Sequence, residues 1–439
     1  MDTQSLLSAR SGPEGTRATL RSSSVRRAVR SALAGMLDDP SALGPCRLRR
    51  TKFKPGTKLT AWFDVGLPSA SRPIAVAWWG GGAGSPPPAP ADAAAEADAR
   101  ERGCAAPFRV LGAHVPHLQM RVHVAPLDST YPGLVPMSDP AHAATVLGYV
   151  APPRIDALRY RPGQRHVLRY QPQFGAAGPT LFAKLSPDER GARHHRSANA
   201  MADILADGPD GVAARPVAYL AAERALVFAE VAGRPLSTRV GRPDATTARG
   251  LRQAGAVLRR IHDADPALLG SPPERSVADE IDEVARASAA IGQLSADTGT
   301  VVGDVLARTR DVLAALPQEA AGLTHGDFKA DHLLVGPRSL TLIDFDKCAV
   351  ADPALDVAKL LADMRWWLEP GAVAAAQDRF IEGYGSSPPA REARARALEP
   401  LFMVKLAARR VQVHQPHWSA RTTGVVEHAD RLLRDLARA

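Results

Sequence analysis

Two short acidic segments in the C-terminal half of the chain hold residues that could do chemistry. The first, HGDFKADH, contains His325, Asp327 and His332. The second, LIDFD, places Asp344 and Asp346 at the end of an apolar run. Carboxylates among apolar residues are costly to bury unless a cation or hydrogen-bond donors satisfy them. The two segments therefore predict a site where carboxylates meet a bound cation or hydrogen-bond donors.

The residue types in these segments match the needs of phosphoryl transfer. Asp327 is a candidate general base for a hydroxyl, His325 can brace the loop through its ring nitrogens, and Gly326 permits a tight backbone. Asp344 is a candidate ligand for Mg²⁺, which favours one or two carboxylates with phosphate oxygens and water. Lys329 could balance charge on the moving phosphoryl group. Such a set suffices, because phosphoryl transfer needs mainly positioning and charge neutralisation.

HGDFKADH followed by LIDFD and DPALD resembles the aminoglycoside phosphotransferase and choline kinase type of small-molecule kinase, itself similar to protein kinases. The resemblance covers about residues 150 to 410. It implies an α+β, two-lobed protein-kinase-like fold, with a β-rich N-lobe and a helical C-lobe, preceded here by an extra β-containing region. It also implies transfer of the γ-phosphate of ATP, with Mg²⁺ or Mn²⁺, to a hydroxyl of a sugar, an antibiotic or another metabolite.

The resemblance also implies roles for individual residues. Asp327 is the catalytic base, Asp344 is the metal ligand, and Lys184 is the strand lysine that grips the α- and β-phosphates. Asp356 is the acid at a helix start that supports the catalytic loop. The other expected contacts are Gly163 over the phosphates, the linker residues Glu230, Val231 and Ala232 at the adenine, and His332 and Asp346 in the metal shell.

Three features depart from the family pattern. His332 lies five residues after the catalytic aspartate, where a kinase has asparagine, and imidazole is a poorer Mg²⁺ ligand than an amide oxygen. The helix expected after Lys184 has no central glutamate, and the hairpin at Gly163 has one glycine where protein kinases have three. These departures leave open a second function, a catalytically impaired kinase-fold protein that binds nucleotide or acts as a scaffold. A protein kinase is disfavoured, because no long activation segment follows LIDFD.

The β-rich half contains two similar hairpins. TKFKPGTKLTAWFDV (residues 51–65) and LRYRPGQRHVLRYQ (residues 158–171) each read as strand, Pro-Gly turn and strand. A further strand follows each hairpin, and the second of these carries Lys184 where the first has Trp78. The match predicts either a degenerate repeat of one β unit or two hairpins that are alike by chance.

These patterns predict a division into four parts. The chain becomes mainly helical from residue 236 onward, with apolar residues at helical spacing. The expected parts are a basic, partly disordered or helical leader (1–40), an N-lobe-like accessory region with a flexible Gly/Pro-rich loop at 80–90 (41–145), the kinase N-lobe (146–235) and the helical C-lobe (236–439).

Charges in the helical half give the only sequence information on the phosphate acceptor. Residues 371–439 carry eleven Lys/Arg and seven Asp/Glu, so they form no acidic basin for a polycationic aminoglycoside. VADEIDEVAR at residues 277–286 gathers four acids, which could serve a cationic substrate or form a solvated helix face. The balance favours a neutral or anionic hydroxyl compound such as a sugar.

Composition excludes several other functions. The net charge of +9 lies mostly in residues 1–60, where twelve Lys/Arg face four acids, and this distribution does not favour a nucleic-acid partner. Cys46, Cys104 and Cys348 are too scattered to predict a disulfide framework or a zinc site. No apolar run approaches the roughly 20 residues that cross a bilayer, so we expect a cytoplasmic protein with no membrane partner. The sequence does not define an oligomeric state.

Overall fold

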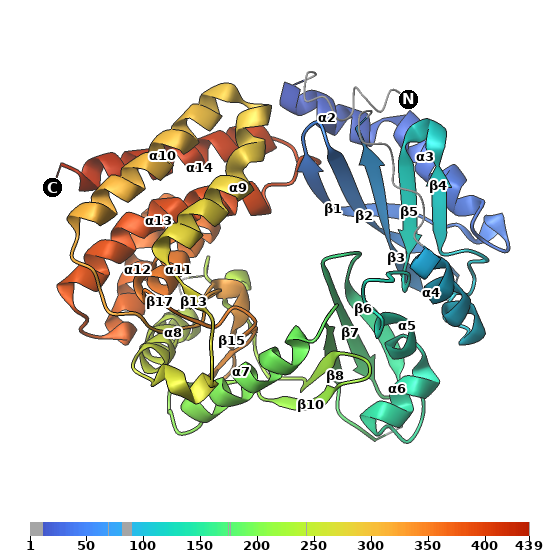
Figure 1. Cartoon of the computed structure of the whole chain (residues 1–439), viewed down its shortest axis with the longest axis horizontal. Helices are drawn as coiled ribbons and strands as arrows, with labels where there is room; N and C mark the ends of the chain where they lie inside the picture. Colours follow the sequence, from blue (N-terminus) through green and yellow to red (C-terminus); the bar gives the residue numbers. More distant parts are fainter. Residues whose placement is uncertain are drawn as a thin grey trace. The chain divides into compact units, whose positions relative to one another are not determined.

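The computed structural model describes residues 12–438 except 69, 81–89, 174, 176 and 243, so most of the predicted loop at 80–90 lies outside the described residues. The chain forms two compact units, one rich in strands and one rich in helices (Figure 1). The first unit comprises residues up to Arg193 with Pro216–Glu230 and Gln412–Ser419, and the second comprises the remainder. The predicted α+β class is confirmed, whereas the finer four-part division stays a prediction.

The first sheet of the first unit is antiparallel, with the order β1-β2-β3-β5-β4. Its strands are β1 (Cys46–Lys54), β2 (Lys58–Gly66), β3 (Ser71–Trp79), β4 (Gly112–Val115) and β5 (Met120–Val124). Helices α2 (Gly12–Arg21) and α3 (Ser23–Ala34) precede it, and α4 (Pro90–Glu101) follows β3. Val25, Val29 and Leu33 recur at helical spacing in α3 and are buried, so this basic stretch packs through one apolar face.

The second sheet of the first unit repeats this topology, with the order β10-β11-β8-β7-β6. Its strands are β6 (Arg154–Arg161), β7 (Arg165–Gln171), β8 (Leu181–Leu185), β10 (Pro216–Leu220) and β11 (Ala225–Ala229). Helix α7 (Arg190–Ile204) follows β8, just as α4 follows β3 in the first sheet. Both predicted hairpins are therefore confirmed, and the shared strand order supports the predicted repeat.

The strand register corrects the residue that was matched to Lys184. When the turn glycines Gly56 and Gly163 are superimposed, Thr60 corresponds to Val167. Thr60 pairs with Ala77, and Val167 pairs with Lys184. The equivalent of Lys184 is therefore Ala77, and Trp78 corresponds to Leu185. Sequence matching was wrong by one residue, which in a strand exchanges the two faces.

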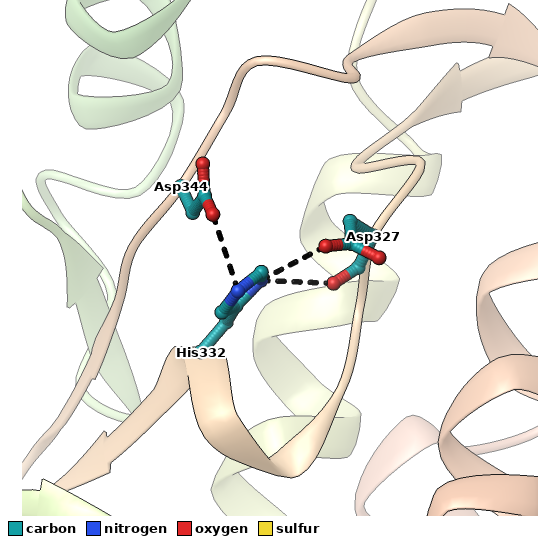
Figure 2. Close-up of side chains that lie close together, drawn as sticks. All are labelled: Asp327, His332 and Asp344. Atoms are coloured by element: carbon teal, nitrogen blue, oxygen red, sulfur yellow. Dashed lines mark hydrogen bonds and ion pairs between the residues drawn. The ribbon is translucent and has the colours of Figure 1, made fainter. Parts of the chain in front are cut away.

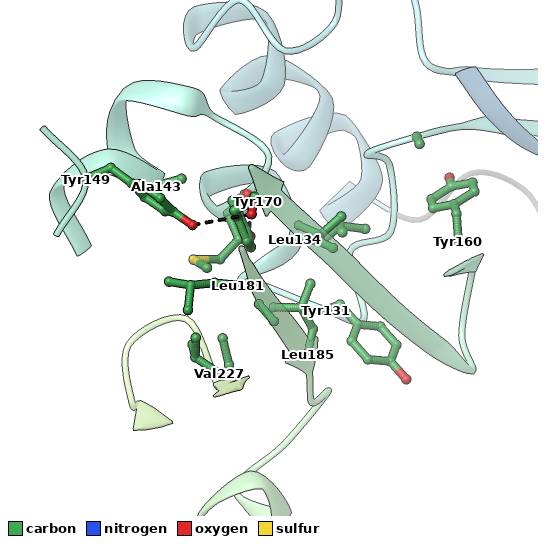
Figure 3. Packing of buried hydrophobic residues seen from close by; sticks show 14 of the residues in the cluster. Tyr131, Leu134, Ala143, Tyr149, Tyr160, Tyr170, Leu181, Leu185 and Val227 are labelled. Carbon is green, nitrogen blue, oxygen red and sulfur yellow. Dashed lines mark hydrogen bonds between the residues drawn. The ribbon is translucent and has the colours of Figure 1, made fainter. Parts of the chain in front are cut away.

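One hydrophobic core joins the two sheets of the first unit, and Figure 3 shows the part of it around the second sheet. Trp62 and Ala75 of the first sheet belong to the same buried cluster as Leu168 and Leu185 of the second. Helices α5 (Leu134–Met137) and α6 (Pro140–Leu147) contribute to it from the segment between the sheets. Because burial of this apolar surface stabilises both sheets together, the first sheet is part of the same folding unit as the second.

The second unit is mainly helical. Its long helices are α8 (Ala245–His262), α9 (Val277–Leu294), α10 (Ala296–Ala315), α11 (Ala354–Trp367), α12 (Pro370–Tyr384), α13 (Pro389–Arg410) and most of α14 (Trp418–Leu436). One small sheet contains β12 (Arg234–Pro235), β15 (Leu333–Val335), β16 (Leu340–Leu342) and β9 (Gly211–Ala213). The other contains β13 (Glu274–Arg275), β17 (Ala349–Ala351) and β14 (Gly322–Thr324). None of the described helices is both long and apolar enough to span a bilayer.

Candidate active site

The two acidic segments meet because a short hairpin returns the chain. The first segment follows β14 and ends in the 3₁₀ turn η5 (Ala330–His332), which leads into β15. Strand β16 pairs antiparallel with β15, and the backbone N–H of Ile343 donates to the carbonyl of His332 at 3.1 Å. This pairing brings Asp344 back beside His332. Asp344 has a φ of 73°, so the strand turns sharply at that residue.

Asp327, His332 and Asp344 converge, with one potential ligand atom from each lying within 4.8 Å of the others (Figure 2). His332 Nε2 lies 3.2 Å from Asp344 Oδ2, and His332 Nδ1 lies 3.0 Å from the carbonyl oxygen of Asp327. The predicted base and two of the predicted metal-shell residues, His332 and Asp344, therefore come together in one cluster.

The donor set of this cluster fits a divalent cation. Burial lowers the pKa of His332 to about 3, so its imidazole is neutral and carries one N–H. If Nδ1 donates to the Asp327 carbonyl, the Nε2 lone pair faces the Asp344 carboxylate, so two hydrogen-bond acceptors oppose each other. In the other tautomer Nε2 donates to Asp344, and the Nδ1 lone pair faces the Asp327 carbonyl instead. A cation bound by Asp344 and His332 would remove this repulsion between acceptors. The carboxylate oxygen and the imidazole nitrogen would then be ligands of Mg²⁺ or Mn²⁺.

Two lysines hold the Asp327 carboxylate. Lys329 Nζ lies 2.7 Å from Asp327 Oδ2, and Lys359 Nζ of α11 lies 2.5 Å from Oδ1. Burial alone would raise the pKa of Asp327, but the ammonium groups of Lys359 and Lys329 outweigh it and hold that pKa well below its usual value. The carboxylate is therefore ionised at neutral pH. The sequence placed Lys329 in the site to balance charge on the phosphoryl group, a role that stays a prediction, and it gave no role to Lys359.

Helix α11 anchors the Asp327 loop through a stripe of polar residues. Asp356 accepts the backbone N–H groups of His325 at 2.6 Å and Gly326 at 3.0 Å, as expected for a loop-supporting acid. Asp363 accepts the N–H of Ala330 at 2.7 Å. Asp356, Lys359 and Asp363 lie at i, i+3 and i+7, so they share one helix face. That spacing, in a helix whose only other charged residue is Arg365, was the signal that could have revealed Lys359 and Asp363.

His325 braces the loop from inside, as its place in the sequence suggested. Its Nδ1 accepts the backbone N–H of Asp327 at 3.2 Å, and its Nε2 donates to the carbonyl of Ile343 at 3.2 Å. Gly326 beside it has a φ of 72°, and a Cβ there would lie 2.0 Å from the carbonyl oxygen of Lys347. Only glycine fits, because both the backbone conformation and the space exclude a side chain.

The remaining predicted residues lie in different places. Lys184 in β8, Gly163 in the β6–β7 turn and Glu230 after β11 belong to the first unit, whereas Val231 and Ala232 belong to the second. Gly163 has a φ of 69°, and its N–H donates to Asp128 at 2.7 Å. Asp346 lies outside the Asp327–His332–Asp344 cluster and faces His194 of α7, with 3.7 Å between Oδ1 and Nδ1. The nucleotide-binding and metal-binding roles of these residues stay predictions.

These loops and the α+β architecture are those expected of a small-molecule kinase. A family model described as "Phosphotransferase enzyme family" matches residues 158–398, which is more than half of the chain. The chain therefore belongs to this phosphotransferase family, and the predicted resemblance is confirmed.

Solved structures of related proteins resemble the chain at low identity. A choline/ethanolamine kinase family protein from Mesorhizobium loti is 18% identical, with a TM-score of 0.48, over 69% of this chain and 100% of that one. A macrolide 2'-phosphotransferase from Brachybacterium faecium is 17% identical, with a TM-score of 0.42, over 65% and 96%. An amicoumacin kinase, solved with AMP-PNP and Ca²⁺, is 14% identical, with a TM-score of 0.46, over 63% and 88%. A search of curated proteins gave no match.

Proposed function

We propose that the protein transfers the γ-phosphate of ATP to a hydroxyl group of a small molecule, with Asp327 as the base and Asp344 as the metal ligand. The observation that carries this proposal is the convergence of Asp327, His332 and Asp344 within 4.8 Å, inside a chain of the phosphotransferase family. Neither acid alone would indicate phosphoryl transfer, but a base beside a cation site is the arrangement that this reaction requires.

In the proposed reaction the acceptor oxygen bonds to the γ-phosphorus of ATP while the bond from that phosphorus to the bridging oxygen breaks and ADP leaves. The proton of the hydroxyl passes to the Asp327 carboxylate. Because Lys359 and Lys329 keep this carboxylate ionised and fixed, its main contribution is to orient the hydroxyl until the P–O bond is well advanced. Asp344 and His332 would hold the divalent cation, which supplies charge neutralisation for the phosphates of ATP.

The second candidate function is nucleotide binding without turnover, and the histidine at position 332 favours it. A family-like ligand at this position would be an amide oxygen, so His332→Asn separates the two candidates. If the protein is an active kinase adapted to histidine, His332→Asn leaves the turnover similar or lower. A rise of about tenfold or more would instead indicate that the natural chain is catalytically impaired.

Thermal unfolding and ADP release together test the proposal. We expect Mg²⁺-ATP or Mn²⁺-ATP to raise the melting temperature, and Asp344→Ala to abolish that rise. Asp327→Asn should keep the rise but lower ADP release, measured across a library of hydroxyl compounds, by about 10²-fold or more. Asp282→Asn is the matched control, because Asp282 is an exposed acid paired only loosely with Arg310 at 3.5 Å. ATP turnover that is the same in Asp327→Asn would contradict the role of the base.

A further inference from the structure

The acidic run on α9 does not form the cationic-substrate site that its sequence left open. Asp279 accepts the N–H and hydroxyl of Ser276 at the start of its own helix, at 2.8 and 2.7 Å. Asp282 lies on the surface near Arg310. Glu280 is buried, with 4% of its surface exposed, and its side chain contacts cations. The solvated-face interpretation is therefore wrong for half of this run.

Glu280 and Glu283 are outnumbered by the cations around them. Arg275 lies 2.6 Å from Glu280 Oε2, Lys405 lies 3.1 Å from Glu283 Oε1, and Lys347 lies 3.6 Å from the same atom. Lys405 also contacts Glu280, and both Arg275 and Arg409 contact Glu283. Burial alone would raise the pKa of Glu283, but Lys405, Arg275 and Lys347 hold it well below its usual value.

This cation cluster continues to the Asp327 loop. Lys359, which contacts Asp327, and Lys405, which contacts Glu280, both lie over the ring of Phe402, with 5.7 and 5.6 Å to its centroid. Lys347 lies against the loop, since its carbonyl oxygen fills the space beside Gly326. Among the described residues, two neighbouring sets of ion pairs result. Lys329 and Lys359 contact Asp327. Glu280 and Glu283 are contacted by Arg275, Lys347, Lys405 and Arg409.

The cations differ in their access to solvent. The side chains of Lys359 and Lys405 are 8% and 4% exposed, so they are buried and neutralise carboxylates inside the protein. Lys347 and Arg409 are 40% and 48% exposed, and Lys329 is 23% exposed. Lys329 contacts the Asp327 carboxylate, and the backbone of Lys347 packs against the same loop at Gly326. Both ammonium groups are partly exposed, so a ligand that approaches this loop from solvent meets positive charge. A polycationic acceptor would place like charges together, which is costly, whereas an anionic group would be attracted.

We propose that the phosphate acceptor is an anionic hydroxyl compound, whose carboxylate or phosphate group is bound by Lys347 at the accessible edge of this cluster. The inference rests on the proposed function, because it names the substrate class of the Asp327 site. Lys347 acts as a specificity-determining residue, and the buried lysines maintain the positive potential behind it.

A panel of matched acceptors tests the substrate class. We would measure ADP release with glycerol, glycerate and glycerol 3-phosphate, with galactose, galacturonate and galactose 6-phosphate, and with the polycation kanamycin. We expect the anionic member of a set to have a kcat/KM about tenfold or more above its neutral member, and kanamycin to give no turnover. Comparing glycerate and galacturonate with glycerol 3-phosphate and galactose 6-phosphate shows whether a carboxylate or a phosphate is preferred. Equal or better turnover of neutral or cationic members would overturn the inference.

The Lys347 variants test the residue. Lys347→Met should raise the KM for the preferred anionic acceptor about tenfold or more with little change in kcat, and Lys347→Arg should restore it. Arg379→Met is the control, because Arg379 is an exposed cation paired with Glu382 on α12. Added salt should raise the KM of the natural protein more than that of Lys347→Met, since screening weakens charge attraction. An unchanged KM in Lys347→Met would overturn the inference.

A binding measurement separates this inference from the proposed function. The preferred anion alone, without ATP, should raise the melting temperature of the natural protein but not of Lys347→Met. If the proposed function fails, Mg²⁺-ATP gives no rise that depends on Asp344, and no acceptor is phosphorylated. If only the present inference fails, neutral acceptors are phosphorylated and Lys347→Met behaves like the natural protein.

Discussion

The two five-stranded sheets of the first unit have the same strand order, the same Pro-Gly turn and a helix after the third strand, yet they differ in the residues that bear on chemistry. The second sheet carries Lys184 on its central strand, and the first has Ala77 at the equivalent register position. Alternating apolar residues and a turn glycine are enough to specify the topology. We expect that a single side chain, Lys184, then distinguishes the sheet that binds phosphates from the one that does not.

Helices α4 and α7, which follow the third strand of each sheet, differ in whether they contain a central glutamate. Helix α4 has a central glutamate, Glu96, whose carboxylate accepts the backbone N–H groups of Leu111 and Gly112, both at 3.0 Å. Helix α7 contains no glutamate in its sequence but follows the strand that holds Lys184. In the first sheet the glutamate of the helix therefore has a structural role, because it binds the backbone at the start of β4. The first sheet supports the fold, and we expect nucleotide chemistry only in the second.

Removal of the first sheet should have the largest effect. Deleting residues 1–140 takes away Trp62, Tyr131 and Met137, which lie in the core shared with the second sheet. It also removes the carbonyls of Leu127 and Met137 that accept the hydroxyls of Tyr160 and Tyr170. Exposure of this apolar face and these polar groups should abolish soluble, active protein. Soluble yield and ADP release are the measurements, and a soluble, fully active fragment would show that the first sheet is dispensable.

The second prediction concerns the residue that distinguishes the sheets. Lys184→Met should lower kcat/KM for ATP by about 10²-fold, because removing one charged group from a phosphate site costs that order of transition-state stabilisation. The matched control is Lys58→Met in the first sheet, where the ammonium lies 4.5 Å over the ring of Trp79. That variant should change stability by less than about 1 kcal/mol and leave the kinetics unaltered. Similar kinetic losses in both variants would remove the functional distinction between the sheets.

The third prediction concerns Asp128, which follows β5 of the first sheet and binds the turn between β6 and β7 of the second. The Asp128 carboxylate accepts the N–H of Gly163 at 2.7 Å, the His166 ring at 2.7 Å and the N–H of Thr130 at 3.1 Å. In Asp128→Asn the amide NH₂ must face one of these donors whichever way it turns. We expect a loss of about 1–2 kcal/mol in stability and a rise in KM for ATP. Asp156→Asn, which alters a partly exposed ion pair with Arg169, should change both quantities much less.

The same variant has a pH signature. Burial opposes ionisation of Asp128, but hydrogen bonds from His166 and Gly163 outweigh it, so the pKa of Asp128 in the folded state is below its usual value. An acid with a depressed pKa stabilises the fold above its unfolded-state pKa of about 4, and this contribution is lost as the pH falls further. The difference in unfolding free energy between the natural protein and Asp128→Asn should therefore be constant near neutrality and shrink below about pH 4. A constant difference down to pH 3 would contradict the assignment.

Sequence reasoning identified those parts of the molecule whose signals are local. The hairpins followed from alternation and Pro-Gly turns, and the pair of acidic loops followed from HGDFKADH and LIDFD. Lys359 and Asp363 were missed although their spacing from Asp356 carries a helical signal. The cations that neutralise Glu283 could not be anticipated, because Lys405 and Arg409 come from α13, more than a hundred residues later in the chain. The one-residue error at Trp78 arose because alternation alone leaves the register of a strand open.

The last prediction uses the two turn glycines as a matched pair. Gly56 and Gly163 both have a φ of 69°, and at neither would an added Cβ meet an atom within 4 Å. Alanine at either position should therefore cost only the strain of a left-handed backbone, about 1–2 kcal/mol, and the two losses in melting temperature should be similar. The kinetics should differ, because the N–H of Gly163 is held by Asp128 in the turn that we expect to cover the phosphates of ATP. Gly163→Ala should raise the KM for ATP several-fold, and Gly56→Ala should leave it unchanged. If both variants raised the KM equally, the two turns would be functionally equivalent, and the distinction between a structural sheet and a nucleotide-binding sheet would have to be abandoned.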